Sequence, residues 1–306
     1  MPLDPVFRSI IEQFSKQKPD MSRITPEEFR KLMNTLLSIS PREDVYKVKD
    51  TVVKGSQAEI PIRLYYPSER PNGILVYFHG GGWVIGDIES YDPLCRAIAK
   101  SCNCIVASVG YRLAPEHKFP AAVIDSFDSL KWVSENAEEI GSKKELIAVG
   151  GDSAGGNLAA VVSILARDNN IPLKYQVLIY PAVGIDATSY SMIEYRWGFF
   201  LEADIMNWFL RNYINSVNDM LDPRFSPILA DDLKGLPPAL VITAEYDPLR
   251  DQGEAYASRL RNAGVPVISV RFNGVIHGFL SFFGISGAGR AAIELIGSVL
   301  KRTFKS

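Results

Sequence analysis

Long hydrophobic runs are missing from this sequence of 306 residues, and cysteine is scarce. The longest apolar runs have the length of a strand, so we expect no segment that spans a bilayer. Cys95, Cys102 and Cys104 form an odd set without Cys-x-x-Cys spacing, and we expect packed, reduced thiols. Reduced thiols, and an N-terminus without the basic and apolar pattern of a signal peptide, predict a cytoplasmic protein.

An excess of charge of one sign is also missing. The chain has 33 Lys and Arg against 35 Asp and Glu, a formal net charge of −2. Nucleic acid and anionic membranes attract basic surfaces, so the balance argues against both as partners. With 47% hydrophobic residues, the chain can bury a large core as one large domain or as a domain with an insertion. The sequence leaves open whether the protein is a homodimer.

Segments with the pattern of strands alternate with segments with the pattern of helices over most of the chain. The predicted strands are 48–54, 60–66, 74–78, 104–109, 146–149, 175–180, 239–243 and 267–272. The predicted helices of this part are 94–100, 121–135, a helix after Ser153, 252–263 and 291–303. This alternation predicts an α/β fold with a mostly parallel sheet and helices on both faces.

Two regions do not follow the alternation. Residues 5–18 and a helix that begins at Pro26, after the capping box of Thr25 and Glu28, precede the first strand. From about 184 to 234 no strand is predicted, although aromatic residues are dense. Both regions are interpreted either as a cover over the substrate or as helices that only pack, and the sequence alone leaves these alternatives open.

A short apolar strand runs into the sequence Gly151-Asp152-Ser153-Ala154-Gly155, which a helix follows. In a Gly-x-Ser-x-Gly turn the serine takes a strained bend, and the glycines let the backbone pass closely. A P-loop is excluded because Asn157 stands where Lys would be needed, and no Gly-x-Gly-x-x-Gly fingerprint is present. Because this pattern is common, a glycine-rich turn with an incidental serine stays open until partners for the serine are found.

A serine nucleophile needs a base, and the chain offers three histidines. His79 ends a strand and His117 lies in an early loop, whereas His277 follows the last predicted strand between Gly274 and Gly278. Loops after parallel strands meet at the edge where Ser153 emerges. We therefore predict His277 as the base.

A carboxylate that orients the base is expected after the strand 239–243. Asp247 is our choice because the Asp-Pro turn fixes it just past that strand. Asp251 and Glu245 remain alternatives, and Asp251 is equally readable as a helix cap.

Backbone N–H groups that bind a developing oxyanion form the third part of such a site. Three successive glycines follow His79, and they can turn their amides toward the serine. We predict Gly81 and Gly82 as donors, with the amide of Ala154 completing the oxyanion hole.

Five motifs in register resemble the hormone-sensitive-lipase family of α/β-hydrolases. They are His79-Gly80-Gly81-Gly82-Trp83, Tyr111-Arg112-Leu113-Ala114-Pro115-Glu116, Gly151-Asp152-Ser153-Ala154-Gly155-Gly156, Asp247-Pro248-Leu249-Arg250-Asp251 and His277-Gly278-Phe279. The resemblance implies an eight-stranded sheet and a carboxylesterase without metal or cofactor that cleaves short- to medium-chain esters. It implies Ser153, Asp247 and His277 as the triad, with the oxyanion hole as above.

The resemblance also implies a division of the chain. Residues 1–45 and 186–230 would form a helical cap, and residues 46–185 and 231–306 the catalytic core. One departure is Gly110, where the family usually has aspartate, and from it we expect Arg112 to lack a local partner.

Two other functions fit the same motifs. A ligand receptor on this fold is expected to have lost the base, whereas His277 is present. Amide or lactone hydrolysis uses the same machinery as ester hydrolysis, and the sequence does not separate them.

Overall fold

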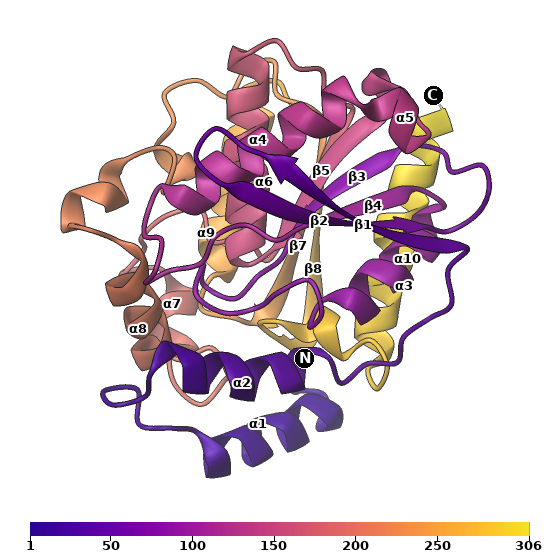
Figure 1. The fold of residues 1–306 in the computed structure, drawn as a ribbon. Coiled ribbons are helices and arrows are strands. Elements are labelled where there is room, and N and C mark those ends of the chain that lie inside the picture. Colours follow the sequence, from indigo (N-terminus) through magenta and orange to yellow (C-terminus); the bar gives the residue numbers. More distant parts are fainter. Residues whose placement is uncertain (306) are drawn as a thin grey trace.

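The computed structural model describes residues 1–305. One eight-stranded sheet has the order β1-β2-β4-β3-β5-β6-β7-β8 and forms the centre of the fold (Figure 1). Strand β2 pairs antiparallel with β1 and β4, and all other neighbours pair parallel. The strands are β1 (Lys47–Lys54), β2 (Glu59–Tyr66), β3 (Ile74–Phe78), β4 (Ile105–Val109), β5 (Ile147–Asp152), β6 (Tyr175–Ile179), β7 (Ala239–Tyr246) and β8 (Val267–Ile276). The predicted α/β fold is confirmed.

Helices cover both faces of the sheet. Helices α3 and α10 lie on one face, and α4, α6 and α9 lie on the other (Figure 1). The helices of the two faces are α3 (Asp92–Cys102), α4 (Ala121–Glu135), α5 (Ala137–Ile140), α6 (Ala154–Asp168), α9 (Arg250–Asn262) and α10 (Gly287–Lys305), with short 3₁₀ turns at η1 (Lys144–Leu146) and η4 (Phe279–Phe282). Within residues 1–305 no helix combines the length and apolar character needed to cross a membrane.

The inner strands are buried on both faces, as a parallel sheet requires. All five residues of β3 are buried, and they alternate between the two cores: Ile74, Val76 and Phe78 belong to one, Leu75 and Tyr77 to the other. The edge strand β1 is mostly exposed and rich in lysine. The carboxyl ends of the parallel strands are thereby held in fixed register at one end of the molecule.

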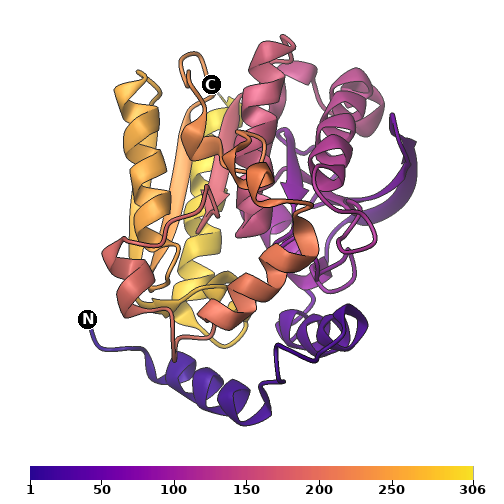
Figure 2. The ribbon, with the colours of Figure 1, turned by 90° about the vertical axis from the view of Figure 1, so that its left-hand side faces the viewer.

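At that end of the sheet lie helices α1 (Pro5–Gln17) and α2 (Pro26–Leu37), as Figures 1 and 2 show. The predicted capping box of Thr25 and Glu28 is present at the start of α2. The segment 186–230 lies at the same end and contains helices but no strand. Its helical turns are α7 (Tyr190–Glu194), α8 (Ala203–Tyr213), η2 (Val217–Leu221) and η3 (Pro227–Leu229).

Polar contacts tie the N-terminal helices to the core. Arg30 of α2 donates to the carbonyl oxygens of Val84 and Ala114 and forms an ion pair with Glu116 at 2.6 Å. After α2, the chain continues to Arg42, whose guanidinium lies 3.1 Å from the carboxylate of Asp92. These contacts fix the position of α2 over the carboxyl ends of the strands.

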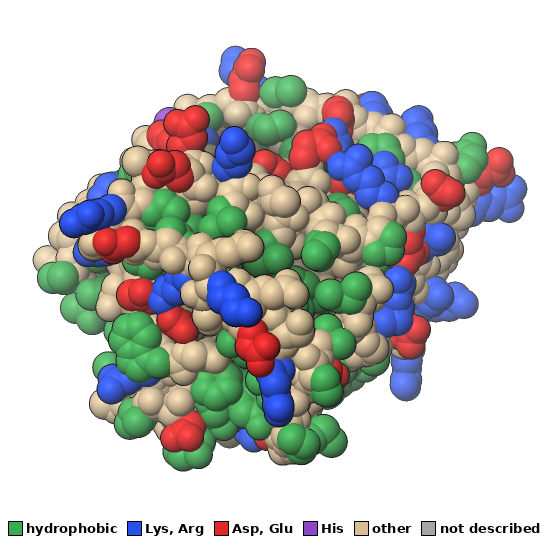
Figure 3. Space-filling view, turned by 90° about the horizontal axis from the view of Figure 1, so that it is seen from below, with side chains coloured by type: hydrophobic (Ala, Val, Ile, Leu, Met, Phe, Trp, Pro, Cys, Tyr) green, Lys and Arg blue, Asp and Glu red, His purple; other side chains and the backbone are tan. Residues whose placement is uncertain are grey.

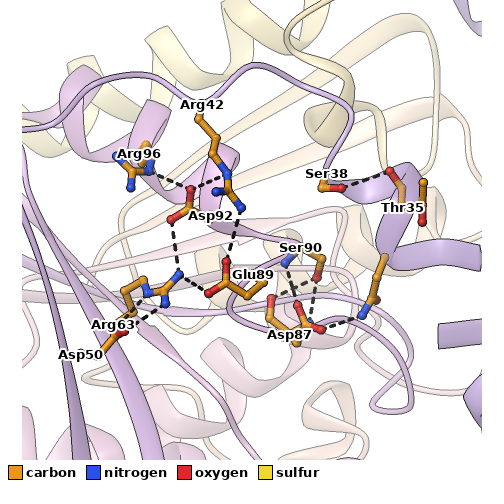
Figure 4. Close-up of polar contacts among 11 residues, drawn as sticks. Thr35, Ser38, Arg42, Asp50, Arg63, Asp87, Glu89, Ser90, Asp92 and Arg96 are labelled. Atoms are coloured by element: carbon orange, nitrogen blue, oxygen red, sulfur yellow. Dashed lines mark hydrogen bonds and ion pairs between the residues drawn. The ribbon is translucent and has the colours of Figure 1, made fainter. Parts of the chain in front are cut away.

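Asp92 is the centre of a cluster of charges (Figure 4). Its side chain is 2% exposed and contacts the guanidinium groups of Arg42, Arg63 and Arg96. Glu89, which is 62% exposed, pairs with Arg63 at 2.7 Å and with Arg42 at 3.4 Å. A buried carboxylate is tolerated here because several cations surround it.

Two of the three predicted reduced thiols are not reduced in the structure. Cys102 and Cys104 form a disulfide, while Cys95 is free and buried. Asn103 between them has a left-handed backbone with φ of 48°, and the Cα atoms of the two cysteines are 5.2 Å apart. That separation suits a disulfide. The expectation was wrong because the turn after α3, which brings these two side chains together, is not visible in the cysteine spacing.

Arg112 has a partner, contrary to the expectation drawn from Gly110. Its guanidinium forms a two-pronged ion pair with the buried carboxylate of Asp125 in α4, at 2.8 and 2.9 Å. The same carboxylate accepts the backbone N–H of Arg112. At Gly110 a Cβ atom would meet Pro61 at 2.9 Å, so the backbone packs closely at this position.

Candidate active site

Ser153 lies in a tight turn between β5 and α6. Its backbone has φ of 56° and ψ of −118°, which is a strained conformation for a residue with a side chain. A Cβ atom on Gly155 would overlap the carbonyl oxygen of Phe78, and one on Gly151 would overlap the backbone of Gly155. Glycine at both positions therefore lets the turn form, and the turn presents the serine hydroxyl at the carboxyl end of the sheet.

Strands β7 and β8 bring two further groups to this hydroxyl. The Nε2 atom of His277 is 2.9 Å from the Oγ atom of Ser153, and its Nδ1 atom is 2.8 Å from an oxygen of Asp247. His277 is 6% exposed and Asp247 is fully buried. The other oxygen of Asp247 accepts the N–H of Leu249, which fixes the carboxylate in the turn past β7. With Asp247 holding Nδ1–H, Nε2 is left to accept the serine proton.

The two alternative carboxylates have other partners. Asp251 accepts the backbone N–H of Ser191 and pairs with Arg250. Glu245 accepts the N–H of Gly274 and pairs with the amino group of Met1. The geometry therefore places Asp247, and neither alternative, against the imidazole.

Strand β8 is longer than predicted and ends directly before His277. Its register against β7 shifts between Ala244 and Tyr246, next to Gly274, whose φ is 76°. This irregularity bends the end of the strand, and it depends on pairing with β7 that local sequence does not show.

The other two histidines do not contact the serine. His79 is buried, its ring stacks on Tyr111 at 4.3 Å, and its Nδ1 atom is 2.7 Å from the carbonyl oxygen of Gly80. Burial lowers the pKa of His79 to about 4, so the ring is neutral at pH 7. His117 lies exposed in a loop. Of the three histidines, His277 is the one whose ring contacts Ser153.

The glycine loop after β3 lies beside Ser153. The carbonyl oxygen of Gly81 accepts the N–H groups of Val84 and Ile85, which folds the loop into a turn. Gly81 and Gly82 have φ of 108° and 58°, conformations that favour glycine. Gly81, Gly82 and Ser153 line one cavity, and Ala154 is the first residue of α6, where backbone N–H groups are free to bind an anion.

Two cavities meet at Ser153. The larger, of about 330 Å³, lies toward the segment 186–230 and is mostly apolar. The smaller, of about 70 Å³, is lined by His277 and by Phe14, Phe29 and Met33 of the N-terminal helices. Both cavities touch the Ser153 turn, and residues of the segment 186–230 form the wall between them. The shared lining residues are Gly82, Ser153, Leu201 and Phe209.

A family model described as alpha/beta hydrolase fold matches residues 75–281, about two thirds of the chain. The chain belongs to the α/β-hydrolase family. The resemblance to the hormone-sensitive-lipase type of this family is thereby confirmed.

This α/β-hydrolase is similar to esterases along its whole length. It is 45% identical to an arylesterase of Saccharolobus solfataricus over 309 residues, which cover 100% of both chains. It is 42% identical to the carboxylic ester hydrolase LipN of Mycobacterium tuberculosis, covering 83% of this chain and 70% of LipN. The solved structure of a hyperthermophilic esterase from Pyrobaculum calidifontis matches with a TM-score of 0.93 and 44% identity, covering 100% of both chains.

Asp152 is a residue of this α/β-hydrolase whose contacts sequence reasoning missed. Its buried carboxylate accepts the N–H of Gly80 at 3.0 Å and the hydroxyl groups of Tyr77 and Tyr91 at 2.8 and 3.0 Å. Burial raises the pKa of Asp152, although these three donors oppose the shift. The only signal in the sequence was an acid between Gly151 and Ser153, and its partners lie more than 60 residues away.

Proposed function

We propose that this chain is a serine carboxylesterase in which Ser153 is the nucleophile, His277 the general base and acid, and Asp247 the orienting carboxylate. One observation carries the proposal: a single buried imidazole lies 2.9 Å from the serine oxygen and 2.8 Å from the carboxylate. The esterase predicted from the sequence is confirmed at the level of the family, since relatives that match over most of their length, the Saccharolobus solfataricus protein and LipN among them, are named ester hydrolases.

In the proposed reaction the Oγ atom of Ser153 attacks the ester carbonyl carbon while Nε2 of His277 takes the hydroxyl proton. Asp247 stabilises the imidazolium that forms. The oxygen of the tetrahedral intermediate accepts the N–H groups of Gly81, Gly82 and Ala154, and each such donor contributes roughly 3 kcal/mol to the transition state.

The intermediate then collapses and the ester C–O bond breaks. His277 gives its proton to the leaving alkoxide, and an acyl-enzyme on Ser153 remains. Water attacks this acyl group, and its proton passes to Nε2. The second collapse releases the carboxylic acid and returns the proton to the Oγ atom of Ser153.

The two cavities suggest how the ester lies. The leaving alkoxide must meet Nε2 of His277, and His277 lines the small cavity, so the alcohol part lies there. The acyl part then extends into the larger cavity of about 330 Å³. Short- to medium-chain acyl groups suit that size. On this proposal residues 1–45 and 186–230 form a cap, because both regions line the cavities.

Labelling and mutation test the proposal together. An organophosphate should modify Ser153 stoichiometrically, and mass spectrometry of the tryptic peptide locates the adduct. Ser153→Ala should lower kcat for p-nitrophenyl butyrate by about a million-fold with the fold intact, as judged by circular dichroism. Unmodified Ser153 in the native protein would favour a receptor, and matched ester, anilide and lactone substrates would separate the hydrolytic activities.

The partner and the location inferred from the sequence are proposals as well. The substrate is a small-molecule ester, nucleic acid is not a partner, and the homodimer stays a prediction that light scattering tests. We also propose a cytoplasmic location. The argument from reduced thiols no longer applies, because Cys102 and Cys104 form a disulfide, and the proposal rests on the missing signal-peptide pattern. Alkylation of thiols in intact cells, compared with and without prior reduction, measures the state of this pair.

A further inference from the structure

A second apolar concavity lies on the outer side of α1 and α2. This groove, which we call the α1–α2 groove, has a volume of about 920 Å³. Its apolar side chains come from both helices, from the residues that follow α2, and from η4 and the loop after it. They are Val6, Ile10, Phe14, Leu32, Leu36, Ile39, Phe282 and Ile285. Figure 3 shows this end of the molecule from below, with apolar side chains at the surface between charged ones.

The rim of the α1–α2 groove carries little charge. Ser9, Gln13 and Thr35 are uncharged, and the two charged side chains, Glu28 and Lys31, have opposite signs. Glu28 is already engaged by the N–H and hydroxyl of Thr25. A groove with an apolar floor and a neutral rim fits an alkyl chain and does not favour an ionic ligand.

Phe14 separates this groove from the active site. Among residues 1–305 it is the one residue that lines both the groove and the small cavity beside His277. Its side chain is 9% exposed and packs against Phe200 with ring centroids 4.9 Å apart. Phe200 in turn contacts Phe282 at 6.1 Å, and Phe282 lines the groove. A wall of aromatic rings therefore divides two apolar spaces that would otherwise be continuous.

We propose that the α1–α2 groove is the outer part of the alcohol site and that Phe14 is the gate that limits its use. The occupant is the alkyl chain of a long primary alcohol esterified to a short acid. This inference rests on the proposed function, because it places the leaving alcohol beside His277. Short alcohols fit inside the small cavity, and a longer chain reaches the groove only when the Phe14 ring turns aside.

The test is the rate on n-alkyl acetates from ethyl to dodecyl, kept below their aggregation concentrations, with acetate release as the readout. Phe14→Ala removes the ring that must be displaced, so kcat/KM for dodecyl acetate should rise about tenfold relative to ethyl acetate. Phe14→Leu should give a smaller rise, and it keeps the test available if the alanine variant does not fold.

Two further variants test whether the alkyl chain of the alcohol binds in the α1–α2 groove. Thr35→Trp, on the exposed rim of the groove, should abolish the gain when it is added to Phe14→Ala. Phe304→Ala is the matched control, because Phe304 is a buried phenylalanine of α10 that lines neither cavity. It should leave the dependence on alcohol length unchanged.

If kcat/KM depends on alcohol length in Phe14→Ala as it does in the wild type, Phe14 is not a gate. If the gain of Phe14→Ala persists after Thr35→Trp is added, the alkyl chain of the alcohol does not bind in the α1–α2 groove. If the wild type is a dimer that Thr35→Trp dissociates, the groove is covered by a second copy of the protein instead. Failure of the proposed esterase function would be recognised separately, because neither the wild type nor any variant would then cleave ethyl acetate.

Discussion

The carboxylate of Asp152 accepts the N–H of Gly80 at 3.0 Å and thereby joins the end of β5 to the start of the glycine loop. Both residues are direct neighbours of groups in the proposed site, since Gly81 follows Gly80 and Ser153 follows Asp152. This buried hydrogen bond and the pairing of β3 with β5 together hold the distance between the proposed nucleophile and the proposed oxyanion donors.

We expect Asp152→Ala to lower kcat on p-nitrophenyl butyrate about a hundredfold with little change in KM, because the loop loses the acceptor that positions it. Asp152→Asn keeps an acceptor oxygen and should lose about tenfold or less. Tyr77→Phe, which removes one donor to the same carboxylate, is the control for general damage to this network. Equal activity of the alanine variant and the wild type would contradict a positioning role.

Substitution of each candidate acid separates Asp247 from its alternatives. Asp247→Asn should lower kcat about ten-thousandfold, because the amide cannot hold the imidazole in the required tautomer. Asp251→Asn and Glu245→Gln should each change kcat by less than about tenfold, since these carboxylates contact the backbone and other charges. Steady-state kinetics at one pH suffices, and a larger loss in Asp251→Asn than in Asp247→Asn would reverse the assignment.

The site residues that we propose were chosen from the sequence for specific reasons. The chain has three histidines, so few candidates for the base had to be compared. Asp247 was chosen because an Asp-Pro turn follows its strand, and in the structure the N–H of Leu249 fixes its carboxylate in that turn. The Gly-x-Ser-x-Gly pattern has few conformational solutions, so the bend at Ser153 followed from local sterics. Strand positions were likewise local, because β3 is a continuous apolar run and β4 and β6 are each interrupted by one polar residue.

The parts that were missed depend on contacts between distant residues. β5 extends through Gly150, Gly151 and Asp152 because these residues pair with β3 and β6. The contacts between Arg112 and Asp125 and between Cys102 and Cys104 depend on how a helix and a turn are placed. No local pattern indicates such contacts, so the sequence left them open or led to the wrong expectation.

The buried carboxylate of Asp92 should be important for stability. Asp92→Asn leaves the guanidinium groups of Arg42, Arg63 and Arg96 without their shared anion, and we expect the free energy of unfolding to fall by about 3 kcal/mol. Glu89→Gln removes an exposed carboxylate from the same cluster and should cost less than about 1 kcal/mol. Urea denaturation followed by tryptophan fluorescence measures both, and similar losses in the two variants would show that burial is not the deciding factor.

The ion pair of Glu116 with Arg30 predicts a pH dependence of stability. The hydrogen bonds from Arg30 lower the pKa of Glu116 to about 2, below its ordinary value. A carboxylate with a lowered pKa stabilises the fold above its unfolded pKa, and that contribution is lost as the pH falls through the folded pKa.

Glu116→Gln should therefore lower the free energy of unfolding by about 0.5 kcal/mol at neutral pH, a modest value because Glu116 is half exposed. The difference between wild type and variant should shrink between about pH 4.5 and pH 2. Denaturation curves at several pH values measure it, and a difference that stays constant across this range would rule out the pair as its source.

The placement of Ser153 between two cavities has a consequence for how such a protein can diversify. In the proposed orientation of the ester, the wall facing its acid half comes largely from residues 182–210. The small cavity, which receives the alcohol half, is also lined by four residues of the N-terminal helices that the larger cavity lacks, namely Phe14, Phe29, Met33 and Leu37. Changes in the N-terminal helices can therefore retune the alcohol half of the substrate with little effect on the acid half, because distant substitutions combine almost additively. Within the segment 186–230, Leu201 and Phe209 border both spaces, so changes there would couple the two preferences.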